Sequence, residues 1–94
     1  MLIRSQNKEN IKNLNLISEI SLVHSNENWE IIVSYPHNGT ISPIGSYSTK
    51  QKAMKVLDNI CSFASGIHFE KVVPNHCGAL YGVVFQMPQD DEVK

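Results

Sequence analysis

The side chains best suited to chemistry lie late in the chain, at His68, His76 and Cys77. Imidazole and thiolate groups bind zinc, but a zinc site takes three or four ligands, usually in close pairs such as C-x-x-C. No such pair occurs here, and His24 or His37 would complete a set only through folding. We therefore predict no bound metal.

A thiol nucleophile would pair Cys77 with the neighbouring His76. Adjacent residues in a strand or turn usually point apart, and no third group stands ready to orient the pair. The chain also lacks a Walker loop, a G-x-G-x-x-G motif and a spaced pair of carboxylates. We predict no catalytic residue, no cofactor and no enzyme activity, and keep an enzyme using Cys77 as the third hypothesis.

A weaker chemical signal lies at Tyr47 and Ser48, where a strand is expected to run into a helix. A helix N-terminus attracts anions because its free N–H groups point outward. Arg4 would join this position if the first strand lies nearby. We name Arg4, Tyr47 and Ser48 as candidate residues for binding a small anionic ligand. The competing interpretation pairs Arg4 with Asp58 or with the acidic tail, and leaves Ser48 as a helix cap.

The helix that would position this site is the clearest element of the chain. Ser48 is a good N-cap, and Gln51 stands at capping-box distance from it. Gly66 suits the left-handed position that follows a helix. Apolar residues recur between them at helical spacing, namely Ala53, Met54, Val56, Leu57, Ile60, Cys61, Phe63 and Ala64. The pattern predicts a helix over 49–65 with Cys61 as a small core residue.

Alternating apolar and polar residues predict strands in most of the remaining chain. The segments are 2–5, 14–23, 29–35, 40–47 and 79–87. Asn38-Gly39 predicts a hairpin, and Pro43 should lie at a sheet edge or a bulge. Segment 68–73 is either a strand or an extended loop, and 73–78 is a turn.

These elements predict an α+β fold, with a mostly antiparallel sheet of about five strands and one amphipathic helix packed on one face. Residues 1–88 would form a single domain, and the acidic residues 89–94 a solvated, frayed tail. With 94 residues, the chain has the length of one domain.

Charge and hydropathy exclude several classes of partner. The net charge is -1, and the only basic cluster, Lys50, Lys52 and Lys55, is best interpreted as a solvated helix surface. We predict no nucleic-acid partner and no membrane partner, since no apolar run is long enough to cross a bilayer. The N-terminus lacks the apolar segment of a secretion signal, so we expect a cytoplasmic protein with free thiols.

Three blocks of sequence resemble a known group of proteins. They are Met1–Lys8 (MLIRSQNK), Gly45–Ala53 together with Val56-Leu-Asp58, and Phe85-Gln-Met-Pro88. In these blocks the chain resembles an uncharacterised family of small proteins from low-GC Gram-positive bacteria and their phages. The resemblance implies a common origin and one shared fold, and it implies no activity. Its Arg4-Ser5-Gln6 block would be a ligand site, a subunit contact or an intramolecular clamp.

Two further hypotheses about function follow. The first is a non-enzymatic, self-associating module that acts by binding, because an open sheet leaves edges that a second copy or a partner protein can cover. The second is a phage-type anti-defence protein that sequesters a nucleotide at Arg4, Tyr47 and Ser48. The first is the function that we expect.

Overall fold

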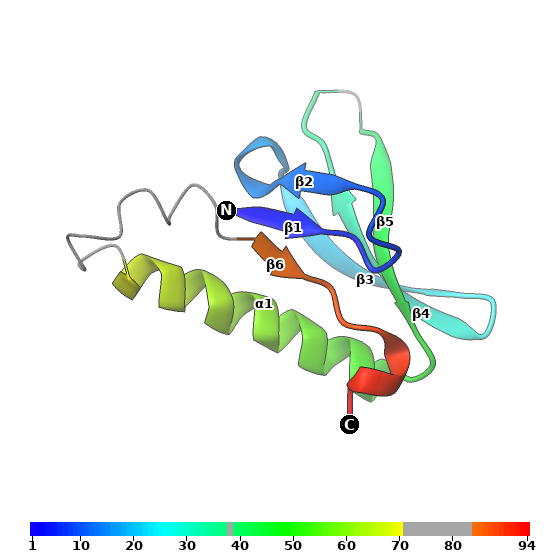
Figure 1. Cartoon of the computed structure of the whole chain (residues 1–94). Coiled ribbons are helices and arrows are strands. Elements are labelled where there is room, and N and C mark those ends of the chain that lie inside the picture. Colours follow the sequence, from blue (N-terminus) through cyan, green and yellow to red (C-terminus); the bar gives the residue numbers. More distant parts are fainter. Residues whose placement is uncertain (38, 71–83) are drawn as a thin grey trace.

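The computed structural model describes residues 1–37, 39–70 and 84–94, and within 65–70 it describes the backbone (Figure 1). The elements in chain order are β1 (Leu2–Arg4), β2 (Ile11–Asn13), the 3-10 helix η1 (Leu14–Leu16), β3 (Glu19–Ser25), β4 (Asn28–Ser34), β5 (Ile41–Tyr47), α1 (Lys50–Glu70), β6 (Val84–Gln86) and the 3-10 helix η3 (Asp90–Glu92).

The strands form two three-stranded sheets. One has the order β2-β1-β6, with β1 antiparallel to β2 and parallel to β6. The other has the order β3-β4-β5 and is antiparallel throughout. The predicted α+β class is confirmed, but the strands are divided between two sheets, because β1 pairs with β6 from the far end of the chain.

Each hairpin connection of the β3-β4-β5 sheet contains a residue with positive φ, and the second lies where Asn38-Gly39 predicts a hairpin. Asn26 takes a positive φ of 55° in the two-residue loop between β3 and β4. Gly39 does the same with φ 66° before β5, and Asn38 lies outside the described residues. The bulge also lies where Pro43 predicts it. Ile31 pairs with Gly45 and Ile32 with Pro43, which leaves one extra residue on the edge strand β5.

The core lies between the β3-β4-β5 sheet on one side and β1 with α1 on the other. Its fully or almost fully buried side chains are Ile3, Ile31, Val33, Ile44, Tyr47, Ala53, Val56, Ile60, Met87 and Val93. Gly45 lies close to two core side chains. A Cβ on it would stand 2.9 Å from Met87 Cε and 3.0 Å from Tyr47 Cε2, so a larger residue would require these side chains to shift.

The helix differs from the sequence prediction at both ends. It begins at Lys50 and continues to Glu70, so Gly66 lies inside it and not after it. A glycine costs an interior helical position only about 1 kcal/mol, which does not force the helix to stop. His68 is therefore helical, and segment 68–73 is not a strand as far as it is described.

The N-cap is Thr49, one residue later than predicted. The Lys52 N–H donates to Thr49 Oγ1 at 3.1 Å, and the Ala53 N–H donates to Thr49 O at 3.2 Å. Ser48 is not the cap because its N–H and hydroxyl are engaged by a residue from the other end of the chain.

The apolar face of α1 is narrower than its composition suggests. Ala53, Val56 and Ile60 are buried, whereas Met54 and Cys61 are exposed. The prediction of a core Cys61 is wrong, because one sheet face contacts only a stripe of the helix, and residues beside that stripe point to solvent.

Segment 14–23 is not one strand as predicted. The Asn13 side chain accepts a hydrogen bond from the Asn15 N–H at 2.9 Å, which caps the short helix η1 where a strand was expected. The preceding residues form the unpredicted strand β2. Local side-chain-to-backbone bonds of this kind compete with strand pairing.

The C-terminal segment is held against the body of the protein, so the prediction that residues 89–94 fray is wrong. Val93 is only 7% exposed and belongs to the core, and Asp90–Glu92 form η3. The last strand is described as Val84–Gln86, while residues 79–83 and the predicted turn 73–78 lie outside the described residues. Among the helices of the described ranges, none combines the length and apolar character needed to cross a membrane.

Candidate functional site

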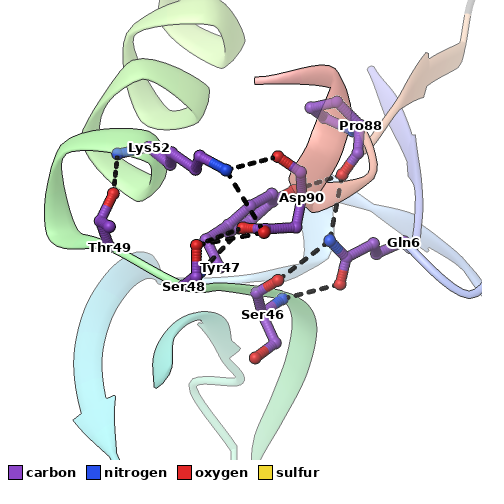
Figure 2. Close-up of polar contacts among 8 residues, drawn as sticks. All are labelled: Gln6, Ser46, Tyr47, Ser48, Thr49, Lys52, Pro88 and Asp90. Atoms are coloured by element: carbon purple, nitrogen blue, oxygen red, sulfur yellow. Dashed lines mark hydrogen bonds and ion pairs between the residues drawn. The ribbon is translucent and has the colours of Figure 1, made fainter. Parts of the chain in front are cut away.

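A polar cluster joins three segments that are far apart in sequence (Figure 2). Gln6 follows β1, Ser46 to Lys52 span the junction of β5 and α1, and Pro88 to Asp90 follow β6. Each of these segments overlaps or adjoins one of the sequence blocks that carry the resemblance. Of the three roles considered for Arg4-Ser5-Gln6, the structure favours the intramolecular clamp.

The side chain of Gln6 connects β5 to the C-terminal segment. Its Nε2 donates to Ser46 O at 3.0 Å and to Pro88 O at 3.1 Å, and its Oε1 accepts from the Ser46 N–H at 2.9 Å. Its backbone N–H donates to Ile44 O at 2.8 Å. Gln6 thus binds the outward-facing groups of β5 much as a neighbouring strand would, and it caps that edge of the sheet.

Tyr47 is buried and serves as a hydrogen-bond donor. It is 1% exposed, and its hydroxyl donates to Pro88 O at 2.8 Å. Burial, reinforced by the negative charges of Asp90 and Glu92, raises the pKa of Tyr47 well above its ordinary value. The phenol therefore stays protonated at neutral pH, which suits a structural bond and not a general base.

Ser48 binds a carboxylate at the N-terminal end of α1. Its N–H donates to Asp90 Oδ1 at 2.8 Å, and its hydroxyl lies 3.1 Å from each Asp90 carboxylate oxygen. Lys52 Nζ adds an ion pair at 3.3 Å to Asp90 Oδ2 and a hydrogen bond at 3.1 Å to Asp90 O. The hydrogen bond from the Ser48 N–H is the main cause that lowers the pKa of Asp90, and the Ser48 hydroxyl and Lys52 add to it.

Where the sequence predicts an anionic ligand, the Asp90 carboxylate of the chain itself binds Ser48. Tyr47 and Ser48 lie together as expected, but Arg4 does not join them. Arg4 is exposed, and its Nε donates to Lys8 O at 3.1 Å. Neither Asp58 nor the acidic tail pairs with it, since the ion pair found among the described residues is that of Lys52 with Asp90.

Sequence reasoning missed Asp90 and Pro88 as members of this cluster. The run Asp90–Glu92 is typical of a solvated tail, and no local pattern marks one of its carboxylates as a partner of Ser48. The only available signal was the polar block ending in Gln6 on a chain end that would otherwise be free to vary.

The other candidate chemistry is only partly described. His76 and Cys77 lie outside the described residues, and so does the side chain of His68. Across the side chains that are described, no three His, Cys, Asp or Glu residues gather as metal ligands would. His24 instead stacks on Trp29, with ring centroids 4.3 Å apart.

Two open hollows lie near the cluster. One of about 180 Å³ lies beside Gln6, and one of about 330 Å³ lies beside Pro88 and the C-terminal residues. Small-molecule sites usually enclose about 300–1,000 Å³. The first hollow is below this range and the second is at its lower end, and neither of the two is lined by Tyr47 or Ser48.

In comparisons with protein-family models, curated proteins and solved structures, none matched this chain.

Proposed function

We propose that this protein is a non-enzymatic binding module that self-associates. The observation that carries the proposal is a difference between the two edge strands of the β3-β4-β5 sheet: β5 is capped by a side chain, and the outer edge of β3 is not paired among the described residues. Gln6 caps the β5 edge through Ile44 and Ser46. Within the described part of the chain, no strand pairs with the outer edge of β3.

The β3 strand lacks the features that usually protect an open edge. It spans seven residues, Glu19-Ile-Ser-Leu-Val-His-Ser25, with no proline and no lysine. Its one carboxylate stands at its first residue. Natural proteins protect exposed edges with prolines, lysines, bulges or very short strands, because an unprotected edge readily pairs with another chain. An edge of this kind suits association.

The polar cluster supports a non-catalytic role. The Tyr47 hydroxyl donates a hydrogen bond to Pro88 O. Ser48 donates a hydrogen bond to Asp90, and Lys52 forms an ion pair with Asp90. A group that is fully engaged within the fold is poorly placed to attack a substrate or to move its protons. Capture of a nucleotide stays a prediction, and the position expected for it is filled by Asp90.

The test is the mass of the native protein as a function of concentration, measured by sedimentation velocity and by native mass spectrometry. We expect the average mass to rise above the 10.6 kDa of one chain as concentration increases. A single species of 10.6 kDa at every concentration would contradict the proposal. An added mass matching a nucleotide would instead favour the sequestering hypothesis.

A further inference from the structure

We infer that the outer edge of β3 pairs with β3 of a second copy of this chain, antiparallel and with the two-fold axis at Leu22. The pairing would join the two β3-β4-β5 sheets into one continuous sheet. This inference rests on the self-association proposed above and adds the surface, the partner and the register.

The hydrogen-bonding pattern of the β3–β4 hairpin determines which groups of β3 face outward. Ser25 and Asn28 flank a two-residue loop, so they form a pair that exchanges backbone hydrogen bonds. Bonded and non-bonded pairs alternate along an antiparallel ladder. The N–H and C=O groups of Ile20, Leu22 and His24 therefore point away from β4, toward the open edge.

In the proposed register, the outward backbone groups of β3 in one copy pair with the same set of groups in the second copy. With the axis at Leu22, this residue faces Leu22 of the second copy, and Ile20 faces His24 of the second copy. Glu19, the only carboxylate of the strand, faces Ser25 of the second copy. No like charges stand opposite each other, so charge does not oppose this register, and the outward N–H and C=O groups of the two copies can pair with one another.

A hollow at the start of β3 supplies a second point of fit. It measures about 250 Å³, and its lining residues are Leu14, Ile17, Ser18, Glu19 and Ile20. The register that places His24 of the second copy opposite Ile20 brings that imidazole to this hollow.

The group that would enter the hollow is already held in place. His24 is exposed, and it stacks on Trp29 with an interplanar angle of 10°. Little side-chain entropy is lost when a group that is already ordered is buried in an interface. Two-fold symmetry repeats the contact, so each copy offers one imidazole and one hollow.

The remaining sheet edges described in the structure fit this role less well. The β2 and β6 strands at the edges of the other sheet have three residues each, and β5 is capped by Gln6. Among these edges, β3 alone offers a long, regular and uncovered row of backbone groups.

The first experiment compares two lysine substitutions on the same sheet face. Val23→Lys places a charge on β3, where Val23 is 37% exposed, and Ile41→Lys places the same charge on β5, where Ile41 is 58% exposed. Lysine on an edge strand opposes pairing. We expect Val23→Lys to weaken association at least tenfold, about 1.4 kcal/mol, while Ile41→Lys associates like the wild type. Equal association by both variants would overturn the inference.

The second experiment uses the wild type and so does not depend on a variant that folds. Amide hydrogen exchange is measured below and above the concentration at which the mass increases. We expect the amides of Ile20, Leu22 and His24 to exchange at least tenfold more slowly at high concentration. Those of Ser21 and Val23, bonded to β4, are expected to be slow at both.

The outcomes separate the two proposals. If the protein associates but the amides of Ile20, Leu22 and His24 exchange equally fast at both concentrations, the β3 pairing is overturned and self-association stands. If the chain is a monomer at every concentration, both are overturned. If Val23→Lys fails to fold, as shown by loss of its melting transition, the exchange result on the wild type decides.

Discussion

The carboxamide of Gln6 pairs with the Ser46 peptide in the way that a peptide from an adjacent strand would. Three of its hydrogen bonds join β5 to the C-terminal segment, and Pro88, one of the acceptors, is 82 residues away in sequence. Removing one partner of such a hydrogen bond lowers stability by more than the net contribution of the bond. The group that remains is shielded from water and has no other hydrogen-bond partner.

We therefore expect Gln6→Ala to lower the free energy of unfolding by about 2–3 kcal/mol, since it leaves Ser46 and Pro88 without their partner. Gln89→Ala is the matched control. It removes an exposed amide with one hydrogen bond to Gln6 O and should cost less than about 1 kcal/mol. Urea denaturation of both variants measures the difference. Similar midpoints for the two would show that Gln6 is no clamp.

The Asp90 carboxylate makes stability depend on pH. Its pKa is lowered in the folded state by the hydrogen bond from Ser48 and by Lys52. Its contribution is therefore present above the unfolded-state pKa, about 4, and is lost as the pH falls through the lower folded-state pKa. We expect Asp90→Asn to be less stable than the wild type at neutral pH, and to lose less stability on acidification below about pH 4.

Asp91→Asn is the control for charge, because Asp91 is the exposed next residue and changes the net charge equally. Thermal unfolding of the three proteins between neutral pH and about pH 2 gives the comparison. Parallel pH profiles for wild type and Asp90→Asn would mean that the contact with Ser48 contributes nothing to the folded state.

At the scale of elements, α1 shows that contact with the sheet determines which of the helix's apolar residues are buried. The helix contacts β4 and β5, and its buried stripe runs through Ala53, Val56 and Ile60. Met54 and Cys61 have equally apolar side chains and are exposed. Periodicity predicts that a helix has a buried side, and the shape of the opposing sheet determines how wide that side is.

Position 60 provides the test of this packing. Ile60→Asp buries a carboxylate without a partner, and we expect it to unfold the domain, because the cost of about 4 kcal/mol or more approaches the stability of a small domain. Asn59→Asp adds the same charge at the exposed neighbouring position and should change stability by less than about 0.5 kcal/mol. Circular dichroism melting curves distinguish the two. A cooperative transition close to that of the wild type in Ile60→Asp would contradict the assignment of the buried stripe.

At the scale of the whole molecule, the two edges of the β3-β4-β5 sheet differ in a way that no single element shows. One edge receives Gln6 from the β1–β2 connection, and the other receives no strand among the described residues. Among the described residues, only the β5 edge of this sheet is capped. Pairing through the remaining edge closes after two copies, because each copy offers one such edge and a two-fold axis uses both.

The sequence by itself determined the elements whose signals are local. The β4 and β5 strands, their hairpin at Gly39, the bulge at Pro43 and the body of α1 all follow from side-chain period and turn residues, which act over a few positions. The same reasoning placed Tyr47 and Ser48 together at the start of the helix, since they are neighbours in the chain.

Only the tertiary structure decided which partners these elements have. The division into two sheets depends on β1 pairing with β6, and the closure of the site depends on Asp90 meeting Ser48, 42 residues away in sequence. Contacts between such distant residues leave no periodic trace in either segment, so an acidic tail in solvent and an acidic segment bound to the fold look alike in sequence. For the same reason Arg4 could not be separated from Tyr47 and Ser48 until the path of the first strand was known.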